Sequence, residues 1–149
     1  MRFNLSVLWQ QGLEMLAVTS QSPTVRTPIA ISLGAIAGAL SRYYITTWFR
    51  EQWGNSWPWG TLFINLTGCV GMGFFVTLVL EKFPTLMPEV RLTIAVGFLG
   101  SYTTFSTYGL ETVIQLRDRG ILPGMMYWGG SAFLGAIAAY LGIILARAR

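Results

Sequence analysis

The chain has 149 residues, of which 53% are hydrophobic and only 11% are charged, and its mean hydropathy is +0.54. Because a soluble globular domain carries about 25% charged residues, this composition indicates one integral membrane domain rather than a soluble protein. The net charge of +4 comes from basic residues scattered between apolar blocks, which excludes the clustered basic face of a nucleic-acid-binding protein. No histidine and one cysteine, Cys69, exclude a disulfide framework and a zinc site.

Residues 1–27 differ in character from the rest of the chain. Apolar residues recur there at helical spacing, with polar residues between them: Leu5, Leu8, Trp9, Leu13 and Leu16. This pattern predicts either a short helix on the membrane surface or a disordered tail. We therefore divide the chain into an N-terminal extension, residues 1–27, and a membrane domain, residues 28–149.

Four apolar segments follow, each close to the ~20 residues that span a bilayer. They cover residues 28–49, 57–80, 92–116 and 121–146. The sequence thus predicts an all-α membrane protein with four transmembrane helices. Tryptophans gather around the first connection, where an amphipathic ring favours the membrane interface.

The basic residues specify the orientation of the four spans only weakly. One side of the membrane would carry Arg2, Arg26, Lys82, Arg91, Arg147 and Arg149, and the other Arg50, Arg117 and Arg119. This small bias indicates a chain able to insert in both orientations.

Arg42 lies well inside the first apolar segment. Either its side chain extends to the interface from a span that ends early, or its charge lines a water-filled vestibule and attracts anions. With no acid deep in a span, the second interpretation favours anions over cations.

The second apolar segment contains Asn65 near its middle. Thr61, Asn65 and Gly68 share one helical face by the three- and four-residue rule. These residues either hold helices together or, for Asn65, supply an amide donor to a pore.

The third segment contains the unusual stretch 97–108, in which two glycines precede a run of hydroxyl and β-branched residues. Such a run predicts a broken helix at mid-membrane, where freed carbonyl oxygens suit a small cation. Phe105 and Tyr108 are three residues apart, so their rings form a column or are ordinary apolar aromatics. In the fourth segment Tyr127 and Ser131 are four residues apart. Both could line a pore; alternatively, Tyr127 is an interface anchor and Ser131 allows close helix contact.

No enzyme is expected, because the chain has no histidine and no nucleophile–base pair. Glu111, about one turn beyond Tyr108, is expected near the aqueous edge. Two alternatives to a channel remain: a proton-coupled small multidrug exporter, which requires an intramembrane carboxylate, and a non-transporting assembly subunit.

Three motifs resemble the CrcB/Fluc family of fluoride channels. They are GALSRY at residues 38–43, GTLFINLTG at 60–68 and GFLGSYTTFSTY at 97–108. The resemblance covers about residue 29 to the C-terminus. It implies a fluoride-specific channel that passively exports fluoride through the bacterial inner membrane.

The resemblance also implies an antiparallel, dual-topology homodimer in which two broken helices meet at the bilayer centre. The carbonyls of Gly100 and Thr103 from both subunits would hold one structural sodium ion there. The implied fluoride pathway consists of Arg42, Thr61, Asn65, Phe105, Ser106, Thr107, Tyr108, Tyr127 and Ser131. Tyr108 departs from the phenylalanine usual in the family, and Gly135 stands where a hydroxyl commonly continues the pathway.

Overall fold

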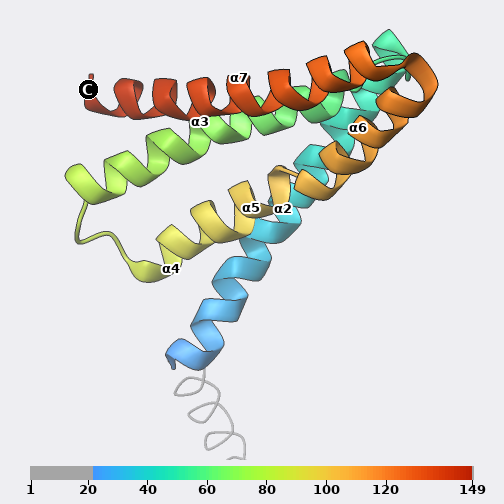
Figure 1. Cartoon of the computed structure of the whole chain (residues 1–149). Coiled ribbons are helices and arrows are strands. Elements are labelled where there is room, and N and C mark those ends of the chain that lie inside the picture. Colours follow the sequence, from blue (N-terminus) through green and yellow to red (C-terminus); the bar gives the residue numbers. More distant parts are fainter. Residues whose placement is uncertain (1–21, 149) are drawn as a thin grey trace, which may run out of the picture.

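The computed structural model describes residues 22–148, which form helices and the turns between them (Figure 1). The predictions for residues 1–21 lie outside this described part. The elements are α2 (Pro23–Trp53), α3 (Trp59–Glu81), α4 (Pro88–Arg91), η1 (Leu92–Leu99), α5 (Gly100–Tyr102), α6 (Phe105–Arg119) and α7 (Ile121–Arg147).

Three helices within residues 22–148 are long and apolar enough to cross a membrane. They are α2, α3 and α7, whose most apolar windows have mean hydropathies of 1.3, 2.0 and 1.8. The all-α prediction is confirmed, as are three of the four apolar segments. The remaining segment, 92–116, is divided among η1, α5 and α6.

The first helix begins five residues before the predicted start at Pro28. Pro23 occupies the start of α2, where a missing backbone N–H removes no helical hydrogen bond. Pro28 therefore lies inside α2 rather than at its boundary, early enough in a long helix for one lost hydrogen bond to be tolerated. The predicted division between residues 27 and 28 thus falls within a helix.

The two continuous helices α3 and α7 lie side by side along much of their lengths (Figure 1). Their backbones touch at glycines: a Cβ atom on Gly73 would overlap the carbonyl oxygen of Ala139, and one on Gly142 would overlap that of Val70. Small residues allow this close approach, which strengthens dispersion contacts between helices in lipid.

The other long helix, α2, packs against η1 and α5. A Cβ atom on Gly34 would overlap the carbonyl oxygen of Thr93, and one on Gly38 would overlap that of Phe98. The segment η1 is a π-helix, with a wider turn than an α-helix, and it leads through the short α5 into the interruption of the third predicted span.

Tryptophans form a cluster at one end of the molecule, as the sequence predicts. The Trp59 ring centroid lies 5.7 Å from that of Trp53 and 6.1 Å from that of Trp57. Trp57 also meets the ring of Tyr127 edge-on at 5.8 Å. This aromatic cluster joins the end of α2 and the beginning of α3 to the first part of α7.

Candidate functional site

The predicted break in the third apolar segment lies at Thr103 and Thr104. Both residues are extended, with φ and ψ of −84° and 159° at Thr103 and of −148° and 116° at Thr104. The helix resumes at Phe105 as α6. The break therefore falls inside the hydroxyl-rich run, just after the second glycine of the predicted stretch.

Asn65 on α3 binds the extended backbone at the break. Its Nδ2 donates to the carbonyl oxygen of Thr104 at 3.1 Å, and its Oδ1 accepts from the backbone N–H of Thr104 at 2.8 Å. In a continuous α-helix this N–H would bond the carbonyl of Gly100 instead. The asparagine amide thus replaces the hydrogen bonds that the break removes.

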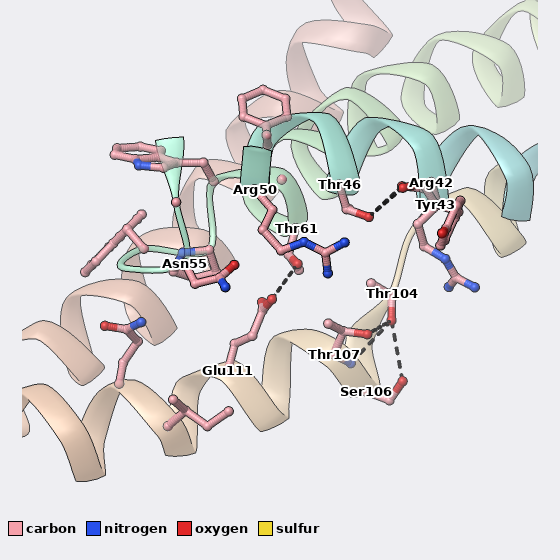
Figure 2. Close-up of a pocket in the computed structure, with 18 of the residues that line it drawn as sticks. Arg42, Tyr43, Thr46, Arg50, Asn55, Thr61, Thr104, Ser106, Thr107 and Glu111 are labelled. Atoms are coloured by element: carbon pink, nitrogen blue, oxygen red, sulfur yellow. Dashed lines mark hydrogen bonds between the residues drawn. The ribbon is translucent and has the colours of Figure 1, made fainter. Parts of the chain in front are cut away.

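The hydroxyl of Thr104 caps the beginning of α6. Its Oγ1 accepts from the backbone N–H of Thr107 at 3.3 Å and donates to the Thr107 hydroxyl at 2.9 Å. The Ser106 hydroxyl lies 3.4 Å from the same oxygen (Figure 2). Two predicted site residues, Ser106 and Thr107, therefore share one hydroxyl network at the start of α6.

Two backbone N–H groups at the break bond side chains, which leaves the carbonyls of Gly100 and Thr103 without their regular helical donors. The N–H of Thr104 turns to Asn65, and the N–H of Thr107 turns to the Thr104 side chain. Carbonyl oxygens released in this way are suitable ligands for a hard cation such as sodium. The donor set at the break fits the sodium ion that the resemblance implies.

The predicted aromatic column is present beside the break. The ring centroids of Phe105 and Tyr108 lie 5.7 Å apart, and Tyr108 continues the column to Tyr127 at 5.5 Å. Phe105 is 84% exposed in the chain, whereas Tyr108 is buried. The Tyr108 hydroxyl donates to the backbone carbonyl of Trp128 at 2.6 Å.

Glu111, which the sequence predicts near the aqueous edge, contacts two of the predicted site residues. The Thr61 hydroxyl donates to its Oε1 at 2.8 Å, and the Tyr127 hydroxyl donates to its Oε2 at 2.8 Å. Glu111 thereby connects two predicted site residues from α3 and α7. One signal was available: Glu111 is the sole acidic residue between positions 92 and 116.

A cavity of about 700 Å³ opens on the α2 side of α6. Its walls include Arg42, Thr61, Thr104, Glu111 and a second cation that the sequence analysis did not select, Arg50. Figure 2 shows the side chains of Arg42 and Arg50 extending from α2 toward the α6 side of this cavity. The predicted vestibule charge is therefore accompanied by another.

A second cavity, of about 750 Å³, lies on the other side of the break. Asn65, Thr104, Phe105, Tyr108 and Ser131 are among its lining residues. Within residues 22–148, the buried Ser131 hydroxyl has no hydrogen-bond partner. Thr104 lines both cavities, so the broken backbone separates them.

Comparison with known proteins gives one consistent result. The family model described as CrcB-like protein, Camphor Resistance (CrcB), matches residues 29–143. A protein of Trichormus variabilis named fluoride-specific ion channel FluC is 59% identical over 127 residues, which cover 85% of this chain and 93% of that protein. Similar proteins of the same name occur in a Synechococcus strain, at 55% identity over 85% of this chain and 96% of that protein, and in Chloroflexus aurantiacus, at 44% over 80% and 94%.

Proposed function

This chain belongs to the CrcB-like family of membrane proteins, and on that premise we propose that it is a fluoride-specific ion channel and not an enzyme. The channel passes fluoride down its electrochemical gradient and thereby lowers the fluoride concentration inside the cell. The observation that carries this proposal is the arrangement at the break, where uncharged donors and aromatic rings from three helices line one cavity.

Fluoride holds its hydration water tightly, so donors along the path must replace that water. The cavity offers the amide of Asn65 and the hydroxyl of Ser131. One hydrogen of the Asn65 amide bonds Thr104, and its second hydrogen remains for an anion. Ring edges of Phe105 and Tyr108 add a weakly positive surface. Neutral donors bind the ion without trapping it, as conduction requires.

The cavity on the α2 side of α6 contains cations that attract the anion before it enters the pore. Arg42 and Arg50 supply two positive charges to the vestibule, which raises the local concentration of fluoride. In the same cavity, the side chains of Thr61 and Glu111 form a hydrogen-bonded group with Tyr127. The hydroxyls of Thr61 and Tyr127 are donors that an ion can meet when Glu111 releases them.

The functional unit is an antiparallel, dual-topology homodimer with four membrane spans in each subunit, the broken third span included. Phe105 is 84% exposed in the single subunit, and Gly100 at the break is also exposed. A second copy of the chain would cover both. The paired breaks would then hold one structural sodium ion by the carbonyls of Gly100 and Thr103, neutralising oxygens that face each other.

The chain is a multi-pass protein of the bacterial inner membrane in this proposal. The weak bias of its basic residues, six on one side and three on the other, supports insertion in both orientations. Such insertion supplies the two antiparallel subunits from one sequence.

The test is ion efflux from liposomes that contain the purified protein, potassium fluoride and potassium chloride. Valinomycin, a potassium ionophore, starts the efflux, and fluoride and chloride electrodes measure it. Rapid loss of fluoride without loss of chloride is expected, and equal retention of both ions would contradict the proposal. Repeating the assay with an imposed pH gradient separates a channel from a proton-coupled exporter that uses Glu111, since only the exporter's flux follows the gradient.

A further inference from the structure

We infer that the Tyr108 hydroxyl is a positioning group that fixes the ring of Tyr108 beside the ion pathway and slows conduction. It is not an anion ligand. This inference rests on the proposed function, and it concerns the position at which this chain carries a hydroxyl in place of the phenylalanine expected from the resemblance.

The hydroxyl is already committed to a neighbouring helix. Its oxygen lies 2.6 Å from the backbone carbonyl oxygen of Trp128, and because a carbonyl only accepts, the tyrosine must donate its single proton there. The bond joins α6 to α7 beside the cavity that Tyr108 and Trp128 both help to line. A fluoride ion in this cavity would need a donor, and the Tyr108 hydroxyl has none left to offer.

The bond fixes the far end of a side chain whose body is held by two other rings. Tyr108 lies 5.7 Å from the Phe105 ring at an interplanar angle of 47°, and 5.5 Å from the Tyr127 ring at 54°. Tyr108 is therefore restrained along its whole length, by ring contacts on its sides and a hydrogen bond at its tip. A phenylalanine here would keep the ring contacts and lose the restraint at the tip.

Ring orientation matters because an aromatic ring has a positive edge and a negative face. A tilt of the ring changes the electrostatic surface that a passing anion meets. While the hydroxyl bond holds, the ring cannot tilt freely with the ion, so breaking the bond becomes part of the barrier to passage. Removing the hydroxyl removes this contribution.

The bond itself can be tested without measuring transport. The protein is labelled with [ζ-¹³C]tyrosine, reconstituted in nanodiscs and measured by NMR in an equal mixture of H₂O and D₂O. The Tyr108 signal is identified by its loss in Tyr108→Phe. We expect it to split into two lines, because a bonded hydroxyl exchanges its hydrogen slowly. A single averaged line, as free tyrosine gives, would overturn the inference.

The effect on conduction is tested by efflux from liposomes with Tyr108→Phe. A net hydrogen bond of about 1 kcal/mol corresponds to about a fivefold change in rate, so we expect fluoride efflux to rise by about that factor. Tyr102→Phe is the matched control and should keep the wild-type rate. The Tyr102 hydroxyl lies 2.9 Å from the Thr67 hydroxyl, and Tyr102 is not among the residues that line this cavity.

The outcomes distinguish the possibilities. An unchanged or lower efflux rate for folded Tyr108→Phe would overturn the inference, since a lower rate would mean that the hydroxyl assists the ion. If the wild-type protein released no fluoride, the proposed function would fail as well. A split Tyr108 signal in that case would assign the failure to the function and leave the hydrogen bond intact.

Discussion

Two regions of this membrane protein satisfy the hydrogen bonds of their backbones in opposite ways. The pair α3–α7 consists of continuous helices that meet at Gly73 and Gly142. The segment η1–α5–α6 begins as a π-helix and is extended at Thr103 and Thr104. In the first region each helix satisfies its own backbone, whereas in the second a side chain from another helix completes the hydrogen bonds.

The difference shows how a broken helix is stabilised in a membrane protein. An unsatisfied peptide group in lipid costs several kcal/mol, so a break needs partners that lipid cannot supply. Here Asn65 of the continuous region provides them. The continuous pair thus holds the broken segment, with its exposed aromatic ring, in place through Asn65.

The largest expected effect is on the broken region, from Asn65→Asp. The substitution removes the donor to the Thr104 carbonyl and places a carboxylate against that oxygen and beside the proposed anion pathway. We expect the free-energy barrier to fluoride passage to rise by about 3 kcal/mol, which lowers the rate by more than about a hundredfold. Fluoride efflux should therefore be abolished. Efflux from liposomes measures this, with circular dichroism to check helix content. A folded variant with wild-type efflux would refute the assignment of Asn65.

The continuous region is tested by Gly142→Ala on α7. The added methyl group would overlap the carbonyl oxygen of Val70, so α3 and α7 must separate. We expect a destabilisation of about 1–3 kcal/mol, typical of overpacking, in denaturant unfolding of the detergent-solubilised protein.

Gly130→Ala on the same helix is the matched control. A Cβ atom at Gly130 meets no heavy atom within 4 Å in the described subunit. Replacing a helical glycine by alanine then stabilises the helix by about 0.5–1 kcal/mol. The two variants should therefore shift stability in opposite directions, and shifts of the same sign would contradict the glycine contact.

A smaller effect concerns the link between the regions at Glu111. Thr61→Val and Tyr127→Phe each remove one donor to this carboxylate. Because both act through the same group, we expect their effects on unfolding free energy to be non-additive by about 0.5–3 kcal/mol. A double-mutant cycle measures the coupling. Simple additivity would show that the two hydroxyls act independently.

The smallest effect is expected at the far end of the continuous pair. Arg147 Nη2 lies 2.7 Å from Glu81 Oε1, with side chains 62% and 41% exposed. Exposed ion pairs contribute little and are screened by salt. Glu81→Gln should leave the melting temperature unchanged at physiological ionic strength. A clear decrease would mean that this pair, and not only glycine packing, holds α3 to α7.

Much of the fold and part of the site follow from local sequence. Apolar length predicts the long helices, and the hydroxyl run after Gly100 predicts the break. Helical spacing alone groups Thr61 with Asn65, and both prove to face the η1–α5–α6 segment. These predictions succeed because each depends on residues close together in the chain.

The rest depends on contacts between distant residues. The break lies at Thr104 because Asn65, 39 positions away, binds its backbone. Glu111 joins the site because Thr61 and Tyr127 lie on other helices. The turn in η1 widens where the backbone of α2 touches it at Gly34, which no local propensity indicates.

The tryptophan cluster has a practical consequence. Four of the six tryptophans, Trp48, Trp53, Trp57 and Trp59, lie at one end of the molecule, close to the start of α7. Intrinsic fluorescence of the native protein therefore reports mainly on that end, without any dye. Quenchers confined to one leaflet of a vesicle would show on which side of the membrane that end lies, and quenching from both sides would support the proposed insertion in two orientations.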